Sequence, residues 1–219
     1  MNVNQPAEST PTWRQWHDEE PIRIGVSSCL LGAEVRYDGG HKLNRYLAEE
    51  LGEFFEWVSV CPEVEIGLGV PRPPIRLVEG RPAPRLVEPE SSEDLTERME
   101  SFARERLAEL QEADLDGFIL KSRSPSCGTE RVKVFGQDEK QVRNGIGIFA
   151  RVLLQAWPDL PLAEDCSLED PDRRRDFFKN VLHRHWRRMQ SKLGLDPQQS
   201  AKLHTDHERL LAHISHDLA

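Results

Sequence analysis

Three short apolar runs, each leading into a turn that carries a cysteine, constrain the fold of this chain most. Short runs bounded by turn-forming residues are typical of buried strands. The runs and the cysteines that follow them are residues 22–26 with Cys29, 54–60 with Cys61, and 118–120 with Cys127. Segments with helical spacing separate these runs. The alternation predicts an α/β fold with a mainly parallel sheet flanked by helices.

Further elements complete the expected architecture. Residues 132–135 are predicted to form another strand, and residues 75–78 and 85–87 a small hairpin. Apolar residues spaced three or four apart predict helices, which cover residues 43–51, 91–112 and 146–157. Ser92 or Asp94 is the expected cap of the second of these helices.

The chain divides into three expected parts. Residues 1–20 are polar and contain prolines, and we interpret them as a flexible leader. Residues 21–170 form the main domain, and residues 171–219 a short helical extension with charged helices at 173–192 and 198–218. A solvated helix face is the favoured interpretation of the histidines of the extension, which are His183, His185, His204, His207, His213 and His216.

Composition excludes two classes of partner. No apolar run approaches the roughly 20 residues that span a bilayer, and the leader lacks the apolar core of a signal peptide, so we expect a cytoplasmic protein and no membrane partner. The net charge of −9 argues against stable binding of nucleic acid, whose affinity comes largely from Lys and Arg. Cysteines of a cytoplasmic protein stay reduced and are free thiols, metal ligands or nucleophiles.

The three cysteines share a position that indicates a metal site. In open α/β sheets ligands bind beyond the carboxyl ends of the strands, so Cys29, Cys61 and Cys127 are expected to converge there. Soft thiolates favour iron–sulfur clusters, zinc or copper(I), and three of them suit a 4Fe-4S cluster with one iron left open. The competing interpretation is three buried small hydrophobes. Cys166 stands in an acidic segment and is interpreted as a bystander.

Polar groups near the cysteines are candidates for acid–base and binding roles. Glu63 and Glu65 follow Cys61, and in an extended segment all three would share a face. Polar residues of the other two loops are candidate hydrogen-bonding groups, namely Asp38, His41, Ser122, Ser124 and Ser126. Arg72 and Arg76 are either anion-binding residues or part of a solvated loop.

Four long motifs identify a resemblance. They are VSSCLLG at 26–32, RYDGG at 36–40, CPEVEIGLGVPR at 61–72 and KSRSPSCG at 121–128. In this order they closely resemble the thiouracil desulfurase (TudS) family, and the resemblance runs from about Ile22 to Val181. Residues 171–219 resemble only the beginning of an all-helical accessory domain found in longer relatives.

The resemblance implies an activity and a set of site residues. It implies a 4Fe-4S cluster on Cys29, Cys61 and Cys127, and non-redox removal of sulfur from thiouracils to give uracil and hydrogen sulfide. It assigns Glu63 as acid–base catalyst and Ser124 as the residue that positions substrate, with Glu65 and Ser122 as the neighbours that could take these roles. Ser122 and Asp38 are the predicted substrate contacts.

Two other classes of function stay open at this point. One is a structural or sensing module that holds a cluster or zinc and binds partners through the His- and Arg-rich extension. The other is a sulfurtransferase in which Cys29 or Cys127 carries a persulfide without metal. For the desulfurase, the thiopyrimidine substrate is a free base, a nucleoside or a nucleotide.

Overall fold

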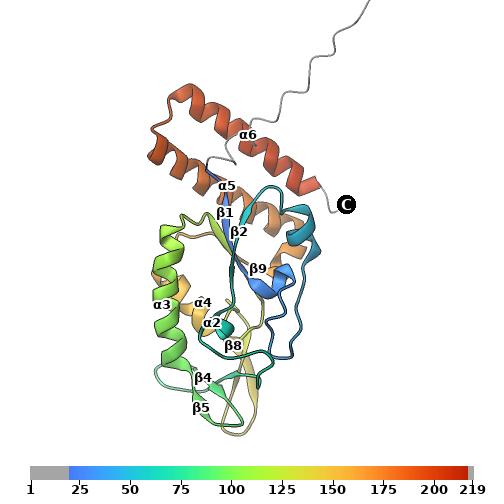
Figure 1. The fold of residues 1–219 in the computed structure, drawn as a ribbon, viewed down its shortest axis with the longest axis vertical. Helices are drawn as coiled ribbons and strands as arrows, with labels where there is room; N and C mark the ends of the chain where they lie inside the picture. The colour runs from blue at the N-terminus through green and yellow to red at the C-terminus, as the bar shows by residue number, and fades with distance from the viewer. Residues whose placement is uncertain (1–19, 217–219) are drawn as a thin grey trace, which may run out of the picture.

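A parallel sheet forms the centre of the computed structural model, which describes residues 20–216 (Figure 1). Its strand order is β2-β1-β6-β9, and every neighbouring pair is parallel. The strands are β1 Arg23–Ser27, β2 Glu56–Val60, β6 Gly117–Leu120 and β9 Leu162–Glu164. The predicted α/β fold and its parallel sheet are confirmed, and the three predicted strands that precede cysteines are β1, β2 and β6.

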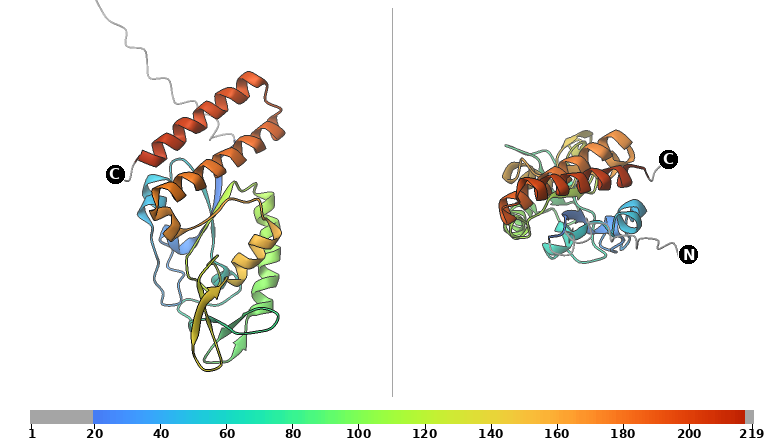
Figure 2. Two further views of the ribbon diagram at one scale, coloured as in Figure 1. Left: turned by 180° about the vertical axis from the view of Figure 1, so that it is seen from behind. Right: turned by 90° about the horizontal axis from the view of Figure 1, so that it is seen from above.

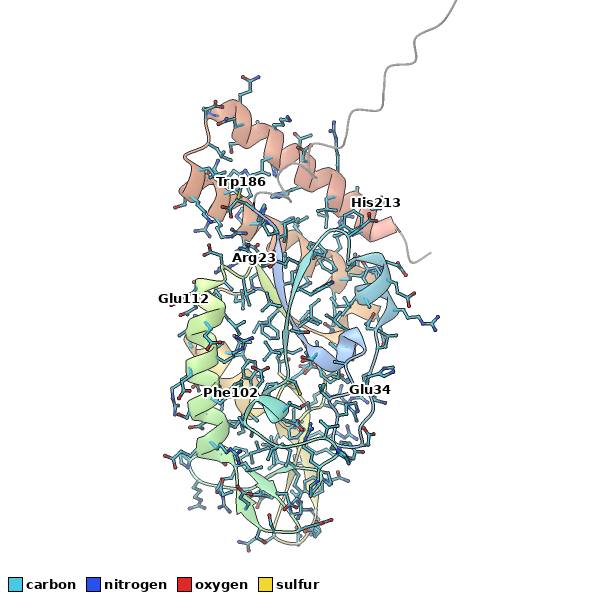
Figure 3. All side chains as sticks on the ribbon, in the orientation of Figure 1. Arg23, Glu34, Phe102, Glu112, Trp186 and His213 are labelled. Atoms are coloured by element: carbon cyan, nitrogen blue, oxygen red, sulfur yellow. The ribbon has the colours of Figure 1, made fainter. Side chains whose placement is uncertain are left out.

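Helices cover both faces of this sheet. Side chains alternate between the faces of a strand, so Phe118 and Leu120 of β6 pack in one core cluster and Ile119 in another. The first cluster lies against α3, Thr96–Glu112, and α4, Ile148–Ala156. The second lies against α5, Pro171–Leu193. Figure 3 shows Phe102 and Glu112 on α3, along one side of the molecule.

A second sheet of five strands lies at the other end of the molecule from the C-terminal helices (Figure 1). Its order is β5-β4-β3-β7-β8, and only the β3–β7 pair is parallel. The strands are β3 Arg76–Val78, β4 Arg85–Glu88, β5 Glu93–Asp94, β7 Val132–Phe135 and β8 Gln141–Gly145. The predicted hairpin is β3–β4. Strands β5 and β8 were not predicted, because both are polar and β8 buries only Gly145.

Two predicted helices have different bounds. The helix predicted at 91–112 begins at Thr96, because Glu93 and Asp94 pair with β4 instead. Asp94 Oδ1 accepts the Thr96 N–H at 3.0 Å, while Ser92 adopts a left-handed φ of 60° in the preceding turn. The helix predicted at 43–51 is only the π-helical segment η2, Tyr46–Glu50.

The C-terminal extension is a hairpin of α5 and α6, Pro197–His216, whose helices lie side by side in both views of Figure 2. Asp170 caps α5 by accepting the N–H groups of Asp172 and Arg173. Phe178 and Val181 of α5 belong to the same hydrophobic core as β1. The core of the main domain therefore continues across the predicted boundary between residues 170 and 171. The other parts of the extension and leader, residues 1–19 and 217–219, lie outside the described residues.

The histidines of this hairpin do not all lie on a solvated face, which corrects the sequence interpretation. His185 and His207 are buried between α5 and α6, whereas His183 and His204 are exposed. No helix in the described range is long and apolar enough to cross a membrane.

Candidate active site

The three predicted cysteines follow three neighbouring strands and face one cavity. Strands β2, β1 and β6 are adjacent, and Ser27 at the end of β1 lies opposite Val60 at the end of β2. Cys29 lies in the turn η1, Ser28–Leu31, Cys61 follows β2 directly, and Cys127 lies in the loop after β6. All three line a cavity of about 430 Å³. The structure thus brings the cysteines together at the carboxyl edge of the sheet, as strand order requires.

The loop that carries Cys127 is held in place by its own side chains and by α4. Ser124 Oγ accepts the N–H groups of Ser126 at 3.2 Å and Cys127 at 3.1 Å, which closes a tight turn. Gly147, which precedes α4, donates its N–H to Gly128 O at 2.7 Å. A Cβ on Gly147 would lie 2.5 Å from the Ser126 backbone, so glycine is required for this approach.

Two carboxylates at the end of β9 anchor the same loop, and the sequence analysis missed them. Glu164 Oε1 accepts the Thr129 N–H at 2.7 Å and the Thr129 hydroxyl at 3.1 Å. Asp165 accepts the Ser122 N–H at 2.7 Å and the Lys121 ammonium at 2.9 Å. A signal for them was available, because a short apolar run leads directly into the acidic pair Glu164 and Asp165.

Glu63 is fixed at the cavity by a buried ion pair. It lies on the short helix α2, Pro62–Glu65. Its Oε2 accepts from Arg72 Nη2 at 2.7 Å and Nε at 3.2 Å, and its Oε1 accepts the Ser126 hydroxyl at 2.9 Å. The side chain of Arg72 is only 5% exposed and that of Glu63 16%. Arg72 is therefore neither an anion-binding nor a solvated residue, but the partner of Glu63.

The helical turn separates Glu65 from Glu63, so the expectation of an extended segment was wrong. Glu65 Oε1 accepts the Cys61 N–H at 2.7 Å, and its carboxylate pairs with Arg106 of α3 at 3.1 Å. Glu65 does not line the cavity, whereas Glu63 does. Both of its oxygens have structural partners.

The three serines do not alternate on one face, because residues 121–128 form a series of turns. Ser122 and Ser124 line the cavity, and Ser122 Oγ accepts from Lys121 Nζ at 2.9 Å. Ser126 is fully buried, does not line the cavity, and donates its hydroxyl to Glu63. Asp38 is exposed and accepts the Gly40 N–H at 3.1 Å, so it shapes the loop and does not line the cavity.

Three further residues do not line the cavity: the polar candidates Arg76 and His41, and Cys166, which was interpreted as a bystander. Arg76 pairs with Glu139 at 2.8 Å on the second sheet. His41 is exposed and its Nδ1 accepts the Leu43 N–H at 3.1 Å. Cys166 is exposed, does not line the cavity, and lies 3.6 Å from Glu164 Oε2.

Comparison with known proteins decides the family. A family model described as 2-thiouracil desulfurase matches residues 24–165, which span the parallel sheet and all three cavity cysteines. The chain belongs to the 2-thiouracil desulfurase family. The resemblance inferred from the four sequence motifs is thereby confirmed, and α5 and α6 lie beyond the matched range.

Two relatives of this desulfurase-family chain extend the comparison. It is 34% identical over 138 residues to the uncharacterized protein YbbK of Bacillus subtilis (strain 168). The match covers 61% of this chain and 90% of YbbK. It is 31% identical, with a TM-score of 0.56, to a solved structure described as the 4Fe-4S-dependent thiouracil desulfidase TudS. That match covers 68% of this chain and 94% of the TudS chain.

Burial in the cavity favours the neutral thiol form of all three cysteines. Burial, together with the neighbouring Cys61, raises the pKa of Cys29 to about 11. Burial also raises the pKa of Cys61 and of Cys127. Three free thiolates are therefore unfavourable here at neutral pH. The same raised pKa values disfavour a metal-free thiolate nucleophile.

The donor set is chemically compatible with a 4Fe-4S cluster. Within residues 20–216, no three His, Cys, Asp or Glu side chains surround one point closely enough to hold a single metal ion. In a 4Fe-4S cluster each thiolate binds a different iron, so three ligands do not have to meet at one point. Three thiols around one cavity of this desulfurase-family chain match that requirement.

Proposed function

We propose that this chain is a thiouracil desulfurase that replaces the thiocarbonyl sulfur of a thiouracil-type pyrimidine with oxygen from water. The reaction converts C=S and H₂O into C=O and H₂S, so no electrons are transferred. The observation that carries the proposal is the meeting of Cys29, Cys61 and Cys127 with Glu63 at one cavity. A free base, a nucleoside and a nucleotide are all candidate substrates.

Cys29, Cys61 and Cys127 are the proposed ligands of a 4Fe-4S cluster. When bound, the cluster supplies an iron without a protein ligand, which acts as a Lewis acid toward the substrate sulfur. The ligand loops form much of the cavity wall, so a substrate ring bound there lies near Glu63, Ser122 and Ser124.

Glu63 is the proposed acid–base group. Its carboxylate takes a proton from the attacking water and returns a proton to the departing sulfur. Arg72 and Ser126 together donate three hydrogen bonds to it, so its position in the cavity is fixed before substrate arrives. A fixed carboxylate loses no conformational freedom when the substrate binds.

Ser124 and Ser122 are the proposed substrate contacts. The Ser124 oxygen already accepts two backbone N–H groups, so its hydroxyl proton remains to be donated to an oxygen or nitrogen of the pyrimidine. Ser122 presents a second hydroxyl whose oxygen is oriented by Lys121. The loop around Asp38 contributes Arg36 and Tyr37 to the cavity wall, in place of Asp38 itself.

A pair of matched variants tests the assignment of the catalytic carboxylate. Anaerobically reconstituted protein is expected to hold about four irons per chain and to release sulfide from at least one member of a panel of 2- and 4-thiopyrimidines. Glu63→Gln is expected to keep the iron and lose roughly 10²- to 10⁴-fold in kcat. Glu65→Gln, whose carboxylate faces α3, is the control and keeps most activity.

Three outcomes would overturn the proposal. Sulfide release by an iron-free, colourless protein would remove the cluster from the reaction. Full activity of Glu63→Gln would move the acid–base role away from this carboxylate. An iron-loaded protein that releases no sulfide from any thiopyrimidine would favour a structural or sensing module instead.

A further inference from the structure

A buried pair of histidines connects the two helices of the C-terminal hairpin. His185 of α5 is 2% exposed and His207 of α6 is 7% exposed. His185 Nδ1 lies 3.0 Å from His207 Nε2, and His185 Nε2 lies 3.0 Å from the backbone oxygen of Glu20. Neither histidine belongs to the desulfurase cavity, and both lie beyond the residues matched by the family.

The contact with Glu20 fixes the tautomer of both rings. A carbonyl oxygen only accepts, so His185 Nε2 carries the proton and donates it. A neutral imidazole has one N–H, so His185 Nδ1 is an acceptor and His207 Nε2 must be the donor to it. His207 Nδ1 is then left with a lone pair. Burial lowers the pKa of both histidines, which keeps the two rings neutral.

This lone pair is buried and unsatisfied. Among residues 20–216, His207 Nδ1 has no hydrogen-bond partner. A buried polar atom without a partner costs about 1–3 kcal/mol, so such atoms in folded proteins call for an explanation. The ring lines a separate cavity of about 290 Å³ between α5 and α6.

Other metal-binding side chains line the same cavity. His204, His207 and Glu208 stand at positions i, i+3 and i+4 of α6 and therefore share one helix face. His183 of α5 lines the cavity from the opposite side. The Trp186 ring lies near both exposed histidines, 5.6 Å from His183 and 6.1 Å from His204 between ring centroids.

We propose that this cavity binds one borderline divalent metal ion, of which Zn²⁺ is the representative, with His207 Nδ1 as the buried ligand and His204 and Glu208 as exposed ligands. Imidazole nitrogen suits such ions. A metal-binding histidine characteristically donates its other ring N–H to a second group that orients it, and here His207 donates to His185. The site goes beyond the proposed desulfurase activity, since none of the residues that line it lines the cysteine cavity. It lies on the hairpin of α5 and α6, at one end of the molecule (Figure 1).

The exposed ligands must turn to complete the site. No three metal-binding side chains within residues 20–216 already surround one point. His183, His204 and Glu208 are exposed, so their rotamers change without disturbing the core. Lys179 also lines the cavity but is exposed and can turn its ammonium toward solvent. All three proposed ligands belong to α6, and His183 lines the cavity from α5.

Calorimetric titration of the full, cluster-loaded chain with Zn²⁺ tests the site. The unaltered chain is expected to bind about one ion, and His204→Ala and His207→Gln to lower the affinity about tenfold or more. His213→Ala is the matched control on the same helix, because His213 lies against Phe54 and does not line the cavity. Figure 3 shows Trp186 and His213 toward different ends of the hairpin.

Each outcome decides the proposal. Titration with Co²⁺ distinguishes the site from the cysteines, because thiolate-bound cobalt gives a strong near-ultraviolet charge-transfer band that imidazole-bound cobalt lacks. No binding of Zn²⁺, or equal affinity in all four proteins, would show that the His207 lone pair serves no metal. His204 is exposed, so His204→Ala keeps the test valid if His207→Gln does not fold.

Discussion

Replacement of Arg72 by methionine tests whether a buried ion pair holds Glu63 in the desulfurase cavity. The Arg72 side chain is 5% exposed and donates to Glu63, to Val35 O at 2.9 Å and to Gly69 O at 3.0 Å. Removal of one partner from a buried ion pair costs about 3–5 kcal/mol, because the other charge remains buried. Glu63 keeps its bond from Ser126 and borders the cavity, so we expect the low end of this range, about 3 kcal/mol.

Urea unfolding of reduced, metal-free protein measures this loss as a change in the free energy of unfolding. The double variant of Arg72→Met and Glu63→Gln also removes the unpaired Glu63 charge. Its loss in the free energy of unfolding is therefore expected to be smaller than the sum of the losses in the two single variants. In the cluster-loaded enzyme, Arg72→Met is also expected to lower kcat. A loss below about 1 kcal/mol, the value of an exposed pair, would show that solvent screens the interaction and that Arg72 does not fix Glu63.

Three further predictions concern the ligands, the loop and the hairpin. Cys127→Ser is expected to lose iron and activity together, and Cys166→Ser to keep both, as iron analysis and sulfide release will show. Gly147→Ala is expected to displace the Cys127 loop, with a loss of about 1–3 kcal/mol in urea unfolding and lower iron content. Burial lowers the pKa of His207, so its contribution to stability is present above the ordinary value of about 6.5 and lost below it, at up to about 1.4 kcal/mol per pH unit. Between about pH 7 and pH 5, His207→Gln should therefore lose less stability in urea unfolding than the unaltered chain; an equal loss would contradict the role of His207.

Local sequence patterns were sufficient to predict the part of the fold that carries the cysteines. Strands β1 and β6 are buried on both faces because helices cover the sheet, and such runs are visible in a sequence. Strand β2 lies at the edge of the sheet and is recognisable from Trp57, Val58 and Val60. Turn residues mark where each run ends. Since the strands are parallel, their cysteines had to meet at one edge, and only the order of the strands was unknown.

Interactions between distant residues account for what was missed. The helical turn of α2 depends on Glu65, which accepts the N–H of Cys61 and pairs with a residue 41 positions further along the chain, Arg106. The edge strand β8 has almost no buried side chain, so it leaves no apolar pattern. The burial of His185 depends on the contact of α5 with α6 and with the backbone of Glu20. None of these partners is adjacent in the sequence.

Two of the proposed ligands, Cys61 and Cys127, and the proposed base Glu63 belong to one hydrogen-bonded unit. Ser126, next to Cys127, donates to Glu63. Arg72 holds Glu63 and also donates to Val35 O, which lies 3.8 Å from the Cys61 thiol as its acceptor. A change at Cys61 or Cys127 therefore reaches Glu63 through one or two hydrogen bonds. Variants of these two cysteines will alter ligation and acid–base chemistry together, and only a change confined to the Glu63 carboxylate separates the two roles.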